Sequence, residues 1–202
     1  INGNVYLLNG NGNEASPKIT FNNYGSVTGD VDVADSLFYN SGTIIGNVSN
    51  LSINDTGSVM QNKYGGIIKG YIEHKTDFVN EQGATVEGGI NSTGSDIINS
   101  GSITGYITQD ADSTFINSGM FTGDLNSHNW INNGIMKLSK VILLDRFENN
   151  GTIMMDQDAY IEALIDNPNI DNWQFDNIRS LNIKGQIGNS FNLPELEAKI
   201  SS

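Results

Sequence analysis

The sequence predicts an all-β fold, a right-handed parallel β-helix (β-solenoid) of about eight to ten coils with a mean coil length near 18 residues. The first observation is a repeated unit: an apolar residue, an Asn two positions later, a Gly, and then aliphatic-x-Gly-x-aliphatic. The second is composition: the 202 residues include 29 Asn and 23 Gly, and the hydrophobic 37% consists largely of β-branched and aromatic residues in short runs. Such a chain turns often and pairs strands between its turns.

The Asn of this unit recurs at intervals of 15 to 22 residues, with a mean of 18. Its positions are Asn23, Asn40, Asn62, Asn80, Asn99, Asn117, Asn132 and Asn149. One unit cannot bury its own apolar face, so successive units must stack. Such variable coil lengths favour a right-handed parallel β-helix over a left-handed hexapeptide helix. At about 4.8 Å per coil, eight coils make a rod of roughly 40 Å.

Each position of the unit has a physical reason. In aliphatic-x-Gly-x-aliphatic, as in Ile103 to Ile107, strand alternation places both aliphatic residues and the glycine on the interior face. Glycine there leaves room for the opposite wall or permits a backbone geometry that a Cβ would oppose. In Asn-x-Gly, as in Asn40-Ser41-Gly42, both residues tolerate the left-handed geometry of a turn. Asn side chains repeated once per coil predict a hydrogen-bonded ladder.

The chain opens with half a unit, Ile1-x-Gly3-x-Val5, so we expect the protein to continue upstream. The units at Met60 to Ile72 and Phe78 to Ile90 hold two extra residues in the turn, which predicts stacked neighbours that share a turn shape. The additional copy at Ile53-x-Asp55-x-Gly57 is interpreted as an extra turn within its coil.

The regular pattern ends after Asn149. Apolar residues between Asp158 and Asn167 have helical spacing, so we expect a short helix or protruding loop in an insertion at 155–172. Phe175-x-Asn177 then resumes the unit, followed by Ile183-x-Gly185-x-Ile187. We therefore predict one β-helical domain at 1–187, with this insertion, and a C-terminal cap or linker at 188–202.

Charge and composition exclude several classes of function. The net charge of −13 argues against a nucleic-acid partner or direct binding to an anionic membrane surface. Without cysteine, and with two histidines, the chain lacks thiolate chemistry and the usual ligands of a structural zinc ion. We expect no cofactor and no metal.

Paired carboxylates are the main candidates for catalysis or Ca²⁺ binding. The pairs, each at i, i+2 spacing, are Asp30 and Asp32, Asp110 and Asp112, and Asp156 and Asp158. The chain has only 10 basic residues to hold an anionic substrate, and it has no recognisable nucleophile or phosphate-binding motif. We interpret the acids as solvated, place His74 and His128 at the surface or in turns, and predict no enzyme.

The outward residues of the aliphatic-x-Gly-x-aliphatic segments form two columns, which we predict to be a self-association or ligand face. The first column is Thr28, Ile45, Lys69, Glu87, Thr104 and Thr122; the second is Asp30, Asn47, Tyr71, Gly89, Tyr106 and Asp124. A polar surface with occasional Tyr suits broad contact with another rod or with a glycan.

Three units resemble the passenger repeats of Gram-negative autotransporter (type V secreted) proteins, most of all the self-associating adhesins. They are Asn40-Ser41-Gly42-Thr43-Ile44-Ile45-Gly46, Asn99-Ser100-Gly101-Ser102-Ile103-Thr104-Gly105 and Asn149-Asn150-Gly151-Thr152-Ile153. The resemblance covers roughly residues 1–154 and 175–187, and two-partner secreted filamentous adhesins share it. It implies a signal peptide and an outer-membrane translocator, which would lie outside this sequence and would be the only link to a membrane.

The expectation is therefore a bacterial cell-surface or secreted adhesin whose many weak polar contacts add up along the rod. Its partner would be a second copy of itself, through rod-to-rod self-association, or a host or matrix glycan or protein. One alternative is a glycan-binding or polysaccharide-degrading β-helix, with Tyr160 and Trp173 walling a groove. A second alternative is the β-helical subunit of a secreted toxin.

Overall fold

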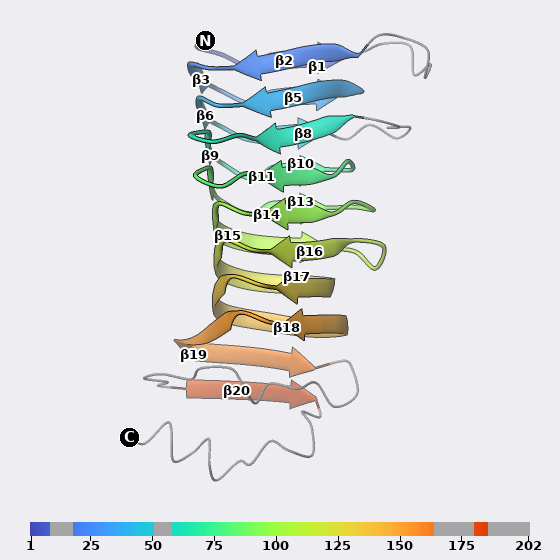
Figure 1. Ribbon diagram of the computed structural model, residues 1–202, viewed down its shortest axis with the longest axis vertical. Helices are drawn as coiled ribbons and strands as arrows, with labels where there is room; N and C mark the ends of the chain where they lie inside the picture. Colours follow the sequence, from blue (N-terminus) through green and yellow to red (C-terminus); the bar gives the residue numbers. More distant parts are fainter. Residues whose placement is uncertain (9–17, 51–57, 164–179, 186–202) are drawn as a thin grey trace.

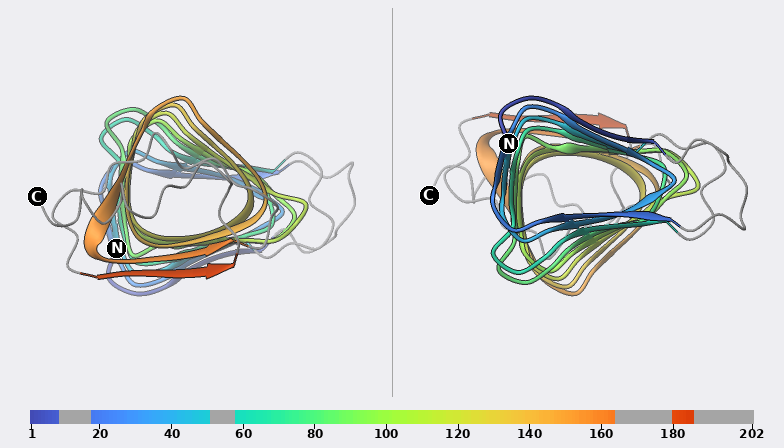
Figure 2. Two further views of the ribbon diagram at one scale, coloured as in Figure 1. Left: turned by 90° about the horizontal axis from the view of Figure 1, so that it is seen from below. Right: turned by 90° about the horizontal axis from the view of Figure 1, so that it is seen from above.

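The computed structural model describes residues 1–8, 18–50, 58–163 and 180–185, and every helix or strand within them is a β-strand. The strands pair in parallel from one coil to the next, and together they form one continuous stack (Figure 1). The all-β solenoid prediction is confirmed, with about eight turns of about 18 residues. Viewed along its axis, the stack has a rounded triangular outline with three faces (Figure 2).

Each coil crosses the three faces in the order face 1, face 2, face 3. Face 1 holds β2 (Ile19–Asn23), β5 (Ser36–Asn40), β8 (Val59–Asn62), β11 (Phe78–Asn80), β14 (Ile97–Asn99) and β16 (Thr114–Asn117). Face 2 holds β3 (Ser26–Thr28), β6 (Thr43–Ile45), β9 (Ile67–Lys69) and β12 (Thr85–Glu87). Face 3 holds β1 (Val5–Leu8), β4 (Val31–Ala34), β7 (Val48–Asn50), β10 (Ile72–His74), β13 (Ile90–Ser92) and β20 (Ser180–Gly185).

Later coils have longer strands that bend around corners. β15 (Ser102–Gln109) and β19 (Thr152–Ala163) run from face 2 to face 3. β17 (Met120–Asn132) and β18 (Ile135–Asn149) continue from face 2 through face 3 to face 1. The coil is right-handed as predicted, because the chain turns clockwise as it recedes from its N-terminus (Figure 2, right).

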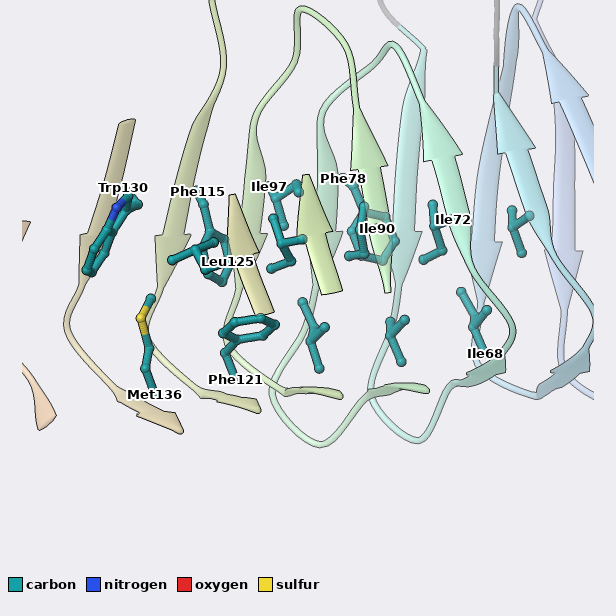
Figure 3. Close-up of a cluster of buried hydrophobic side chains, with 14 of the residues drawn as sticks. Ile68, Ile72, Phe78, Ile90, Ile97, Phe115, Phe121, Leu125, Trp130 and Met136 are labelled. Atoms are coloured by element: carbon teal, nitrogen blue, oxygen red, sulfur yellow. The ribbon is translucent and has the colours of Figure 1, made fainter. Parts of the chain in front are cut away.

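The core is made of columns of like side chains, because equivalent residues of successive coils pair directly. On face 1 the inward column is Phe21, Phe38, Met60, Phe78, Ile97, Phe115, Trp130 and Phe147. Rings stack at both ends of it, with centroids 5.6 Å apart for Phe21 and Phe38 and 5.0 Å for Trp130 and Phe147. Figure 3 shows part of this column facing buried side chains of the other two faces, which include the ring of Phe121 among aliphatic residues.

The aliphatic-x-Gly-x-aliphatic segment turns the corner between faces 2 and 3. Both aliphatic residues are buried, as predicted for Ile103 and Ile107. The expectation that the glycine lies on the interior face of a strand is wrong, because Gly105 has φ +136° and forms the bend. The other expected role of the glycine, a backbone geometry that a Cβ would oppose, is confirmed. A Cβ on Gly105 would lie 2.6 Å from the carbonyl carbon of Gly88 in the preceding coil, so close backbone stacking also requires glycine.

The Asn-x-Gly turns differ from the prediction in the short coils. Neither Gly25 nor Gly42 has a positive φ. Gly42 is needed for close approach, since a Cβ on it would lie 2.7 Å from the backbone nitrogen of Gly25. The prediction that the two long turns stack and share a turn shape is confirmed: Gly65 and Gly83 both have φ +79°, and the Gly65 N–H donates to the Gly83 carbonyl at 3.3 Å.

The helix expected from Asp158 is wrong as far as Ala163, where β19 ends. Ala159 and Ile161 are buried, while Tyr160 and Glu162 between them are partly exposed, which is strand alternation. Ile183 pairs with Ile161. It therefore occupies the second aliphatic position of aliphatic-x-Gly-x-aliphatic, whereas the prediction placed it at the first. The expected features at Ile53–Gly57, 164–172, Phe175-x-Asn177 and 188–202 lie outside the described residues.

Candidate functional site

The Asn residues form the predicted ladder at the end of face 1. From Asn23 to Asn149, each Nδ2 donates to the Oδ1 of the next Asn along the rod at 2.8–2.9 Å. The Nδ2 of Asn149, the last of the eight, has no hydrogen-bond partner among the described residues. The buried amides also bond turn carbonyls, as Asn80 does with Ser102 at 3.2 Å, so the ladder is structural.

Face 2 presents two outward columns. The first contains the predicted column and extends it: Thr28, Ile45, Lys69, Glu87, Thr104, Thr122, Lys137 and Met154. The second was missed by sequence reasoning: Ser26, Thr43, Ile67, Thr85, Ser102, Met120, Ile135 and Thr152. This second column could have been found in the sequence, because each of its members directly precedes the first buried aliphatic residue of a unit.

Charge is sparse on these two columns. Lys69, Glu87 and Lys137 are their only charged members, in a chain whose net charge is −13. Lys69 and Glu87 pair across neighbouring coils, with Nζ and Oε2 3.8 Å apart and both side chains about half exposed. The other members are Ser, Thr, Ile and Met, so face 2 is a nearly neutral strip.

The second predicted column lies along the corner between faces 2 and 3, here called the corner column. Two of its side-chain oxygens accept from backbone N–H groups of the following coil: Asp30 Oδ1 from Asn47 at 2.8 Å, and Asn47 Oδ1 from Tyr71 at 3.1 Å. Asn4, one coil before the predicted column, makes the same kind of contact, since its Oδ1 accepts from the Asp30 N–H at 3.0 Å. Asp30 and Asn47, predicted as ligand residues, therefore hold coils together.

Beyond Gly89 the corner column is different in character. Tyr106 pairs with Asp124, and Lys140 and Tyr160 follow in the next two coils. Lys140 and Tyr160 continue the predicted column into coils in which the glycine of aliphatic-x-Gly-x-aliphatic is replaced by another residue. A surface groove of about 200 Å³ opens here, lined by Tyr106, Ile107, Thr108, Asp124, Leu125, Asn126, Lys140 and Ile142.

A buried polar cluster lies at the end of face 3. His74 is fully buried, which corrects its predicted place at the surface or in a turn. Its Nδ1 lies 2.6 Å from the Thr76 carbonyl and 3.1 Å from Ser95 Oγ, whereas its Nε2 has no hydrogen-bond partner among the described residues. Burial lowers the pKa of His74 to about 4, although the Thr76 carbonyl and Asp77 favour the charged form. The ring is therefore neutral at physiological pH and inaccessible to a substrate.

Two of the candidate acids, Asp110 and Asp156, make hydrogen bonds to other groups of the protein. Partial burial opposes ionisation of Asp110, but hydrogen bonds from Ser113 Oγ and the Gly94 N–H outweigh it and lower the pKa of Asp110. Asp112 lies in the same turn, and Asp156 Oδ2 lies 3.3 Å from Ser139 Oγ. No group of three or more His, Asp or Glu side chains that could hold a metal ion occurs among the described residues.

His128, unlike His74, is partly exposed, and its Nδ1 contacts Asp145 Oδ2 at 2.5 Å. The pair lies near the corner between faces 3 and 1, in β17 and β18. It is a surface contact between neighbouring coils, in agreement with the predicted surface or turn position.

No family model, curated protein or solved structure matches this chain. Within the described ranges, no helix could span a membrane. Architecture and surface chemistry therefore carry the functional argument.

Proposed function

We propose that this chain is the adhesive rod of a bacterial cell-surface or secreted adhesin, and that face 2 is its contact surface for a second copy. The nearly neutral strip on face 2 is the observation that carries the proposal. Two rods with a charge of −13 each repel one another at most orientations. The two outward columns of face 2 carry only Lys69, Glu87 and Lys137 as charges, which reduces that repulsion.

The chemistry of face 2 also suits a broad, shallow contact. Hydroxyl groups of Ser and Thr donate and accept hydrogen bonds, and the methyl groups of Thr and the side chains of Ile and Met supply apolar area. Because the same pattern recurs once per coil, weak contacts repeat along the rod and add up. In antiparallel packing, Lys137 of each rod faces the end of the other rod that is farthest from that rod's own Lys137.

Sedimentation of the purified protein over a concentration and salt series tests this proposal. We expect a reversible dimer that strengthens as salt rises from about 0.01 M to 0.15 M, because the Debye length falls from about 30 Å to 8 Å and screens the repulsion. Asp30 and Asn47 are poor choices for substitution because their side chains hold neighbouring coils together.

The decisive variant is Thr104→Glu with Thr122→Glu, which places two acids in adjacent coils of face 2. It should weaken the dimer by about tenfold or more. The matched control is Thr20→Glu with Asn22→Glu, which adds the same charge to exposed positions of face 1. A protein that stays monomeric at every concentration, or a dimer weakened equally by both variants, would contradict the proposal.

A further inference from the structure

The groove on the corner column is a second surface feature, distinct from face 2. We propose that this groove, centred on Tyr106, Asp124 and Lys140, binds one sugar residue of an uncharged glycan. Tyr106 pairs directly with Asp124, and Lys140 lies in the next coil at the register shift opposite Asp124, so all three line the groove from one edge of the rod.

Gly89 makes room for the aromatic part of this site. It occupies the corner-column position one coil before Tyr106. A Cβ on Gly89 would lie 2.8 Å from Cδ1 of Tyr106, so the Tyr106 ring lies across the glycine. The ring is therefore held against the rod and is still 42% exposed. An aromatic face fixed in this way provides an apolar platform for the C–H face of a pyranose.

Polar groups of both hydrogen-bonding types surround the platform. Asp124 and Asn126 offer acceptor oxygens, and Lys140, Asn126 and Thr108 offer donors, within a groove of about 200 Å³. Ile142 adds apolar surface to the lining. A ring with one apolar face and hydroxyl groups around its edge matches this lining, since small-molecule sites combine apolar walls with a few converging polar groups.

Charge selects among glycans. Asp124 and Lys140 both line the groove and carry opposite charges, so its lining has no excess of either sign. Lys140 Nζ lies 5.3 Å from the centre of the Tyr160 ring, a cation–π contact at the rim of the groove. The remainder of the chain is strongly acidic, with a net charge of −13. An uronic or sulfated glycan would be repelled, and an uncharged one would not.

Calorimetric titration with defined hexasaccharides tests the inference. The uncharged probes are cellohexaose, maltohexaose and chitohexaose, and a hexamer of galacturonic acid is the charged comparison. We expect at least one uncharged probe to bind with a Kd below about 10 mM, and Tyr106→Ala to weaken it by about tenfold. Tyr24→Ala is the matched control, because Tyr24 is 80% exposed beside Gly25 in a turn between faces 1 and 2.

Lys140→Met and Asp124→Asn, both at exposed positions, provide the same test if Tyr106→Ala does not fold. Absence of binding to all three uncharged probes overturns the inference, as does preferential binding of the galacturonate hexamer. Binding unchanged by Tyr106→Ala, or by both replacement variants, also overturns it. Sedimentation of Tyr106→Ala should match that of the unsubstituted protein, so failure of this site and failure of face 2 are distinguishable.

Discussion

Asn80 illustrates why single buried amides matter in this fold. It is fully buried and lies in the middle of the ladder, accepting from Asn62 Nδ2 and donating to Asn99 Oδ1, both at 2.9 Å. It also donates to the Ser102 carbonyl. Removing this side chain takes one hydrogen-bond partner each from the buried amides of Asn62 and Asn99 and from the Ser102 carbonyl, which is more costly than losing an exposed hydrogen bond.

We therefore expect Asn80→Ala to lower the free energy of unfolding by about 2–4 kcal/mol. Asn22→Ala, at an exposed position of β2, should change it by no more than about 0.5 kcal/mol. Urea denaturation of both variants measures the two values. Equal effects would show that the ladder contributes nothing specific.

His74 makes stability depend on pH. Its pKa is lowered from 6.5 to about 4 in the fold, so the unfolded chain binds more protons than the native one in this window. Stability is complete above pH 6.5 and falls as the pH drops toward 4, by roughly 3 kcal/mol in total.

To test this, the free energy of unfolding is measured at pH 7 and at pH 4.5, for the unsubstituted protein and for His74→Gln. The variant should lose distinctly less stability between the two pH values. Asp110 does not confuse the comparison, because its pKa is lowered from 3.8 and its contribution is lost only at more acidic pH, in both proteins. Parallel pH profiles would contradict the assignment.

The corner between faces 2 and 3 is the element in which glycine matters most. Gly105 combines φ +136° with the close approach to Gly88, so a side chain there is opposed by both backbone strain and overlap. In the coils of β18 and β19 the equivalent positions are Leu138 and Met155, both buried, where the strand runs through the corner with a shifted register. Two solutions to the same bend therefore occur in one rod.

Gly105→Ala should lower the free energy of unfolding by about 3 kcal/mol or more. Gly25→Ala is the comparison, because Gly25 has no positive φ and a Cβ there would meet nothing within 4 Å. It should be neutral within about 1 kcal/mol. Thermal denaturation resolves the difference, and similar melting temperatures for the two variants would exclude the close-stacking argument.

The sequence predicts those elements in which a repeated unit fixes the register from coil to coil. The Asn ladder, the buried aliphatic pairs and the shared long turns were predictable, because each position recurs many times. The strand at Asp158–Ala163 was not, since its apolar residues fit a helical period as well as an alternating one. His74 was also misplaced, because its column at the end of face 3 changes residue type in every coil.

The candidate sites were predictable only in part, for a related reason. Tyr106 and Asp124 could be assigned from the glycine motif that precedes them. Lys140 and Tyr160 follow coils in which the glycine is replaced and the register shifts, so their place in the corner column requires the structure. The hydrogen bonds from Asp30 and Asn47 to the next coil also could not be predicted from the sequence, because they depend on the direction of a neighbouring backbone N–H.

At the scale of the whole molecule, the described strands of each coil pair with those of the coils before and after it, which makes the stability of the rod approximately a sum of neighbour terms. Few charges of the described residues lie on face 2, so the rod can remain soluble and still offer a surface for association. Face 2 and the groove beside Tyr106 lie on adjacent parts of the perimeter, which allows both to be occupied at once.

Hydrogen bonds between coils run along the rod, and this has a mechanical consequence. A pull on the two ends loads the bonds of the terminal coil first, so the chain should unravel one coil at a time. Each released coil of about 18 residues adds roughly 60 Å of contour length. Single-molecule stretching should give a sawtooth with this spacing, whereas one abrupt extension would contradict it. A rod anchored at one end would thereby dissipate a sudden drag force in small steps and keep its remaining coils intact.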